Sequence, residues 1–91
     1  MPDRIIDNLN KKRFELREQG KIAFATYRRE GDRVVILHVE SPEELRGMGV
    51  AARLMAGLLE YSRARHQKVM AVCPYAAEFV RRHPQYHDVA S

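Results

Sequence analysis

A glycine pair in the middle of the chain has the spacing of an anion-binding loop. Gly47 and Gly49 follow Arg46 directly and stand between a strand-like apolar run and a run with helical spacing. Backbone N–H groups in such a loop, at the start of a helix, bind anions. No Gly-Lys-Ser/Thr follows, and no third glycine, so neither the Walker A nor the dinucleotide pattern is met. The alternative is that the glycines only permit a tight turn.

His38 is a second residue with chemical potential. By strand alternation it shares a face with Val34 and Ile36, where a histidine is often a partly buried polar group. An imidazole titrates near neutral pH, so His38 also suits a general base that removes a proton from an attacking amine. The pattern alone leaves both interpretations open.

Cys73 is the chain's one cysteine, which excludes an internal disulfide and fits a reducing, cytoplasmic location. Pro74 suits the first position of a helix, so we expect Cys73 to occupy the cap position of that helix. A thiol there lies at the positive end of the helix dipole, which favours the nucleophilic thiolate. A free cysteine is as commonly a small buried apolar residue.

The composition bounds the class of protein. With 91 residues, 45% hydrophobic and 31% charged, we expect one globular domain over 1–91. The net charge of +4 favours a polyanionic partner, either a nucleic acid or a phosphorylated cofactor. Clustered aromatic residues for base stacking are missing, so nucleic acid is the weaker choice. No apolar run approaches the roughly 20 residues that span a membrane, and no metal site is expected.

The strand-like runs come mainly from the first half of the chain. Alternation around residues 13–17 and the apolar runs 22–28 and 33–40 predict three strands. Turn signals at 19–21 and 30–32 join them into an antiparallel meander. Residues 1–11 are polar and show no clear period.

The second half predicts a helix, a strand and another helix. Residues 50–65 have helical spacing, and Gly57 inside them costs about 1 kcal/mol relative to alanine, which indicates a close contact with the sheet. Residues 69–73 are apolar throughout, as in a strand buried on both faces. With strand 33–40 they form a βαβ unit, expected to be right-handed. A second helix begins at Pro74 and ends near His83.

These residues resemble a known family. Arg46-x-x-Gly49-x-Ala51, after a strand and opening a helix, is similar to the Arg/Gln-x-x-Gly-x-Gly/Ala signature of the GNAT superfamily of N-acetyltransferases. Residues 38–51, 68–69 and 73–86 together resemble its minimal branch, whose chains are about as long as this one. The resemblance implies an α+β fold, a truncated GNAT-like fold in which an antiparallel meander leads into a βαβ unit with a C-terminal helix.

The resemblance also implies an acetyl-CoA-dependent N-acetyltransferase, in which an unidentified amine attacks the thioester directly. The pyrophosphate would lie on the N–H groups of residues 47–51, and the pantetheine arm would follow the edge of strand 33–40. Backbone N–H groups near Val39 and Glu40 would stabilise the developing oxyanion. The residues expected to bind the cofactor are Val39, Glu40, Arg46, Gly47, Met48, Gly49, Val50, Ala51, Arg53 and Tyr75, and those expected in catalysis are His38 and Cys73.

The chain departs from the wider family at its general acid. The usual tyrosine is replaced at Phe79-Val80, so an acid must come from elsewhere. Tyr75 is one candidate, although it also suits an aromatic at the edge of the core. The reduced acceptor side keeps two alternatives open: a CoA-binding or acyl-CoA-binding module with little catalysis, and, less favoured, a small basic RNA-binding domain. We expect a monomer or a weak homodimer.

Overall fold

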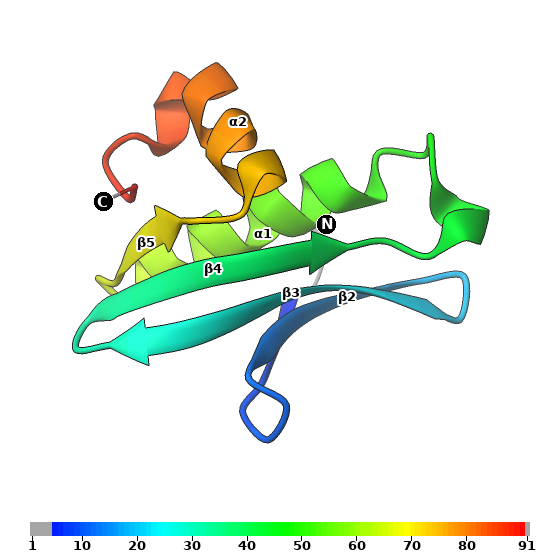
Figure 1. The fold of residues 1–91 in the computed structure, drawn as a ribbon, viewed down its shortest axis with the longest axis horizontal. Coiled ribbons are helices and arrows are strands. Elements are labelled where there is room, and N and C mark those ends of the chain that lie inside the picture. Colours follow the sequence, from blue (N-terminus) through cyan, green and yellow to red (C-terminus); the bar gives the residue numbers. More distant parts are fainter. Residues whose placement is uncertain (1–4, 91) are drawn as a thin grey trace.

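The protein folds as a five-stranded sheet with two helices (Figure 1). The computed structural model describes residues 5–90, and the strands lie in the order β1-β2-β3-β4-β5. The first four strands are antiparallel, and β5 is parallel to β4. The elements are β1 (Ile5–Asn8), β2 (Arg13–Glu18), β3 (Lys21–Glu30), β4 (Arg33–Glu40), α1 (Val50–Ala64), β5 (Lys68–Ala71) and α2 (Pro74–Arg82), with single turns of 3₁₀ helix at Glu43–Leu45 and Pro84–Tyr86. The predicted α+β fold is confirmed.

β1 is a strand that the sequence pattern did not reveal. It has four residues, two apolar followed by two polar, so it shows no alternation. Ile5 pairs with Leu16 of β2 and points toward α1, whereas Ile6 points to the other face and is exposed. Pairing with β2 and contact with α1, which is distant in sequence, therefore stabilise this edge strand.

α1 covers one face of the sheet and lies behind it in Figure 1. Its buried side chains join those of β2, β3, β4 and α2 in one apolar core. Gly57 is where α1 comes closest to β1, because a Cβ built on Gly57 would lie 2.5 Å from Cγ1 of Ile5. The predicted close contact between this glycine and the sheet is confirmed.

The prediction of a strand over 69–73 buried on both faces was wrong. β5 ends at Ala71, and only Val69 in it is fully buried. Val72 is 55% exposed. The main core cluster lies on the α1 side, so alternate side chains of β5 face away from it and stay at least partly accessible.

A β-bulge in β4 changes the face on which His38 lies. Ile36 pairs with Tyr27 and His38 with Thr26, so Leu37 is an extra residue with no partner in β3. Tyr27 is in the core, and Thr26 faces the opposite side. His38 therefore lies on the face away from α1, and the expectation that it shares a face with Val34 and Ile36 was wrong. Strand alternation reverses at a bulge, and the sequence does not mark one.

None of the helices within residues 5–90 is long and apolar enough to cross a membrane.

The contact between Gly57 and Ile5 predicts that the effect of Gly57→Ala on stability depends on the residue at position 5. Gly57→Ala adds helix propensity but forces Ile5 outward, so we expect it to lower the free energy of unfolding by about 1 kcal/mol. In an Ile5→Ala background the contact is relieved, and the same substitution should raise the free energy of unfolding by about as much. Urea unfolding of the four variants measures this, and equal effects of Gly57→Ala in both backgrounds would contradict it.

Candidate functional site

The ladder between β4 and β5 stops halfway along β4. Its last pair is Ile36 with Ala71. The N–H groups of Val72 and Cys73 then both donate to the carbonyl oxygen of Ile36, at 3.0 and 3.2 Å. Pro74, which has no N–H, starts α2. Beyond Ile36, β4 pairs with β3 on one side, and no described strand pairs with its other edge, so residues 37–40 offer an open strand edge.

The glycine loop brings the start of α1 beside that edge. Gly47 and Gly49 have φ angles of 83° and 74°, a region that disfavours side chains. Gly49 is the N-cap of α1, no side chain caps the helix, and its first turn has no acidic residue. The first N–H groups of a helix have no partner inside it. The loop therefore presents free donors and the positive end of a 15-residue helix, the arrangement that binds an anion.

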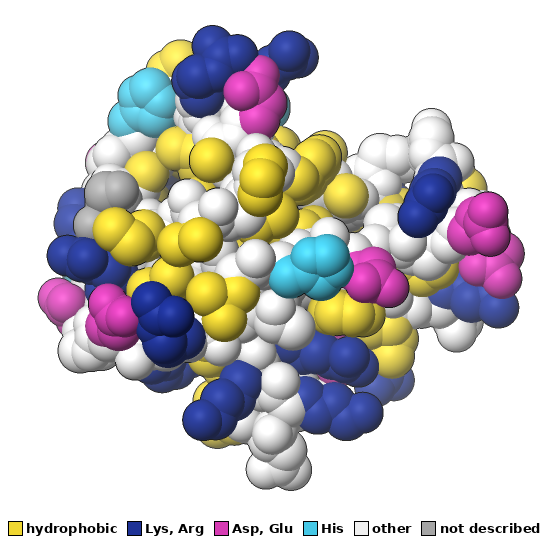
Figure 2. Space-filling view, in the orientation of Figure 1, with side chains coloured by type: hydrophobic (Ala, Val, Ile, Leu, Met, Phe, Trp, Pro, Cys, Tyr) yellow, Lys and Arg dark blue, Asp and Glu magenta, His cyan; other side chains and the backbone are white. Residues whose placement is uncertain are grey.

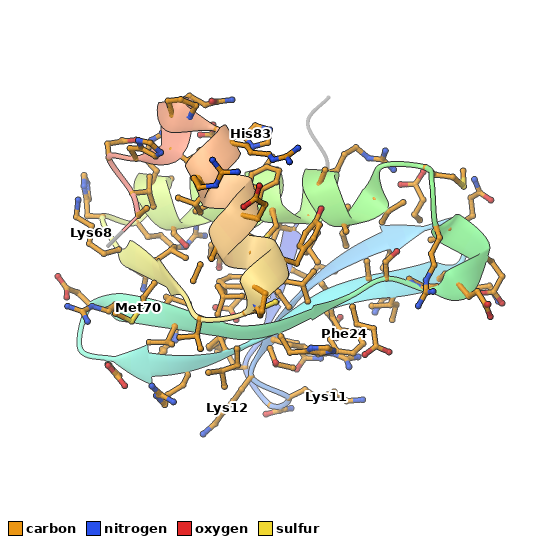
Figure 3. All side chains as sticks on the ribbon, turned by 45° about the horizontal axis from the view of Figure 1, so that its top comes forward. Lys11, Lys12, Phe24, Lys68, Met70 and His83 are labelled. Atoms are coloured by element: carbon orange, nitrogen blue, oxygen red, sulfur yellow. The ribbon has the colours of Figure 1, made fainter. Side chains whose placement is uncertain are left out.

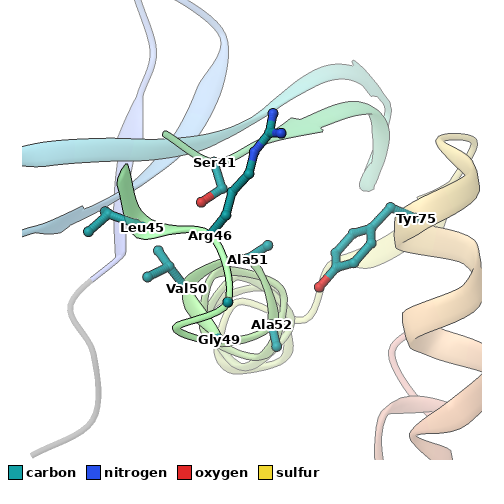
Figure 4. Close-up of a pocket in the computed structure, with 9 residues that line it drawn as sticks. Ser41, Leu45, Arg46, Gly49, Val50, Ala51, Ala52 and Tyr75 are labelled. Atoms are coloured by element: carbon teal, nitrogen blue, oxygen red, sulfur yellow. The ribbon is translucent and has the colours of Figure 1, made fainter. Parts of the chain in front are cut away.

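Two adjoining hollows join the loop to the strand edge, and Figure 4 shows the first of them. Their volumes are about 230 and 470 Å³, which is within the range of small-molecule sites when they are taken together. The first is lined by Ser41, Leu45, Arg46, Gly47, Gly49, Val50, Ala51, Ala52 and Tyr75, and the second by His38, Val39, Glu40, Ser41, Arg46, Ala51 and Tyr75. The residues that line both show that the hollows form one continuous site.

Ser41 is a site residue that sequence reasoning missed. It lines both hollows, and its Oγ is buried with no hydrogen-bond partner. A buried hydroxyl without a partner is unfavourable, so this atom is suited to pair with a polar group of a ligand. The only signal in the sequence is its place at the end of β4. Leu45 and Ala52 also line the site without having been predicted.

Tyr75 stands on the opposite wall, at the start of α2. Its phenol oxygen points across the first hollow toward the first turn of α1 (Figure 4). Burial raises the pKa of the Tyr75 hydroxyl above its usual value. The group is therefore protonated at neutral pH and can donate a hydrogen bond or a proton.

His38 and Glu40 form a pair at the open end of β4. Nε2 of His38 lies 3.0 Å from Oε1 of Glu40, and both side chains are exposed. Such a pair contributes little to stability. Its carboxylate can orient the imidazole ring and attract a cationic substrate.

The structure places three predicted site residues outside the hollows. Cys73 is the N-cap of α2 and is only 7% exposed, and its carbonyl accepts the N–H of Ala77 at 2.9 Å. Met48 is exposed on the loop. Nη1 of Arg53 donates to the carbonyl of Met48 at 2.9 Å, and Nη2 lies 2.9 Å from Oε1 of Glu18. Arg53 thus links the loop to β2, and its expected contact with phosphate stays a prediction.

The remaining predicted residues all line the hollows. Phe79 and Val80, where the family's usual tyrosine is missing, do not, since Phe79 is buried in the core and stacks on His83. Among residues 5–90 no group of three or more metal-ligating side chains is present. The site offers a ligand backbone donors, a strand edge and a few polar side chains.

Known proteins resemble this chain in sequence and in fold. A family model of GCN5-related N-acetyltransferases matches residues 13–89. The fold is similar to the solution structure of a GCN5-like protein from Staphylococcus aureus, an inferred N-acetyltransferase. The TM-score is 0.74 at 26% identity, over 99% of this chain and 89% of that one. Comparison with curated proteins gives no match.

The bracing role of Arg53 predicts an energetic coupling with Glu18. Arg53→Gln and Glu18→Gln each break the same partly exposed ion pair, so their effects on the free energy of unfolding should be non-additive by about 0.5 kcal/mol. A double-mutant cycle by urea unfolding measures the coupling. Strict additivity would show that the pair does not hold the loop.

Proposed function

The chain belongs to the GCN5-related N-acetyltransferase family, and we propose that it transfers an acetyl group from acetyl-CoA to an amine. The observation that carries this proposal is the open edge of β4, which the two adjoining hollows connect to the free N-terminus of α1. A strand edge suits the amide groups of a pantetheine arm, and a helix N-terminus suits a pyrophosphate. The pantetheine arm and the pyrophosphate of acetyl-CoA would therefore lie side by side in this site.

One observation that is independent of the family match supports acetyl-CoA as the ligand. The orphaned Oγ of Ser41 lies where the two hollows meet, between the strand edge and the loop. In this proposal the backbone donors of residues 47–51 and the Arg46 side chain hold the phosphates. Residues 39–40 and Ser41 hold the pantetheine arm. Acetyl-CoA supplies an activated acyl group, and the chain supplies its orientation and the proton transfers.

His38 and Tyr75 divide the proton transfers between them. His38 takes the proton that the amine loses as its nitrogen bonds to the acyl carbon, and Glu40 orients the ring. The carbon–sulfur bond breaks, and the Tyr75 hydroxyl donates a proton to the leaving sulfur. The protonated state of Tyr75 at neutral pH supports this role. Cys73, buried at the α2 cap, is the second candidate for the acid.

A CoA-binding module without catalysis is the second candidate function. The observation in its favour is that His38 and Glu40 are exposed. The core elements α1 and α2 lie on the other side of the sheet, so nothing described encloses an acceptor. Binding and turnover therefore need separate tests.

The binding test compares acetyl-CoA with single-stranded RNA by thermal shift and calorimetry. Acetyl-CoA at 100 times its dissociation constant should stabilise the fold by about 2.7 kcal/mol, and RNA should not stabilise it. Arg46→Gln should raise the dissociation constant roughly tenfold, because it removes a charge-assisted contact. Arg82→Gln, on the far end of α2, is the matched control and should have no effect. Stabilisation by RNA but not by acetyl-CoA would overturn the proposal.

The turnover test uses thiol release from acetyl-CoA with a panel of amines. His38→Gln should lower kcat by at least about 100-fold, as expected for loss of a general base. Tyr75→Phe should lower kcat while leaving the dissociation constant of acetyl-CoA nearly unchanged. Binding with no turnover of any amine would favour the CoA-binding module.

Direct attack also predicts that Cys73 is not acetylated. Intact-mass spectrometry after incubation with acetyl-CoA alone should show no acetyl adduct that depends on Cys73. An adduct that disappears in Cys73→Ala and is discharged by an amine would show an acyl-enzyme route instead.

A further inference from the structure

The face of the sheet away from α1 leads directly from His38 and Glu40 to a pair of arginines. Because of the bulge in β4, His38 is in register with Thr26 and Glu40 with Phe24. Thr26 is in turn paired with Arg13, and Phe24 with Glu15. The side chains of these rungs point to the same face. From β4 to β2 this is two strand spacings, about 10 Å.

The β2 end of these rungs holds an ion pair between Arg13 and Glu15. The guanidinium carbon of Arg13 lies 4.4 Å from the centre of the Phe24 ring, and its Nε lies 2.7 Å from Oε2 of Glu15. Glu15 is 2% exposed and also accepts a hydrogen bond from Asn8 at 3.0 Å. Burial raises the pKa of Glu15, but these hydrogen bonds and the nearby arginines outweigh it, so the pKa is lowered and the group is ionised.

Arg17 adds a second positive charge near Glu15, so the two arginines and this one carboxylate leave the β2 end with a net positive charge. It is exposed on the same face of β2, and within residues 5–90 no ion pair to it is seen. Figure 2 shows Lys and Arg side chains gathered over β2 and β3, beside hydrophobic side chains and a histidine next to an acidic side chain. The face is therefore acidic beside the predicted base and has a net positive charge at Arg13, Glu15 and Arg17, with the Phe24 ring between them under the Arg13 guanidinium.

We propose that the acceptor is a small amine that carries a carboxylate or phosphate. This deepens the proposed function and rests on it. The ammonium end lies at Glu40 and His38, the hydrocarbon part crosses β3 beside the Arg13 guanidinium that covers the Phe24 ring, and the anionic end pairs with Arg13 and Arg17. The separation of two strand spacings, about 10 Å, sets the length of the molecule. Both ends are bound within three strands, which favours a small molecule over a protein side chain.

Three acceptors that share a primary amine on a chain of similar length test the proposal. 6-Aminohexanoate carries a carboxylate at the far end, hexylamine carries nothing, and 1,5-diaminopentane carries a second ammonium. We expect kcat/KM to be roughly tenfold higher for 6-aminohexanoate than for hexylamine, as for one charge-assisted hydrogen bond, and lowest for the diamine. Equal rates for 6-aminohexanoate and hexylamine, or a preference for a lysine peptide without acidic residues, would overturn it.

Arg17→Glu is the decisive variant, because Arg13→Gln would leave the buried Glu15 without its ion-pair partner and would destabilise the fold. Arg17→Glu should remove the preference for 6-aminohexanoate and favour the diamine, while the rate with hexylamine stays within about twofold. Arg65→Gln, at the end of α1, should leave the order of acceptors unchanged. An unchanged order in Arg17→Glu would contradict the proposal.

A binding measurement without cofactor separates this proposal from the proposed function. 6-Acetamidohexanoate, the corresponding product, should shift backbone amide NMR signals in residues 13–17, 24–26 and 38–40, and N-hexylacetamide should shift them less. Such shifts in a protein that shows no turnover would keep the anionic site while refuting the transferase. Turnover of amines without such shifts, and without a preference for 6-aminohexanoate, would keep the transferase and refute the anionic site.

Discussion

The site depends on a single carbonyl oxygen. The Ile36 carbonyl accepts the N–H groups of both Val72 and Cys73, and this double acceptance ends the ladder between β4 and β5. A carbonyl oxygen has two lone pairs, so it can satisfy both donors at once. Pro74 lacks an N–H, so the chain leaves the sheet and begins α2. The last residues of β4 are consequently exposed at one edge, and Tyr75 faces them from the other wall.

The second requirement is a loop that stays in place without a capping side chain. The two glycines adopt positive φ angles, and Arg53 ties the loop carbonyl of Met48 to Glu18 at the end of β2. A side-chain cap would compete with an anion for the same N–H groups. Arg53 thus stabilises the loop through Met48 and Glu18, and the N–H donors at the start of α1 stay free for a ligand. Backbone geometry, more than any one side chain, defines the predicted phosphate site.

Much of this was predictable from the sequence, and the exceptions have physical causes. The strands at β2, β3 and β4 and the helix α1 carry strong periodic signals, and the glycine spacing indicated an anion site. β1 was missed because short edge strands carry little alternation. The bulge at Leu37 has no sequence signature, so His38 was assigned to the wrong face. Ser41 and the bracing role of Arg53 arise from contacts between segments distant in sequence, which no local pattern encodes.

Backbone amide hydrogen exchange, measured by mass spectrometry with and without CoA, tests the central claim most directly. CoA should slow exchange in two segments at once, residues 37–41 at the open edge of β4 and residues 46–52 at the start of α1. Exchange in β1 and in the turn between β3 and β4 should be unchanged. Protection confined to other segments, or to the loop without the strand edge, would contradict the account.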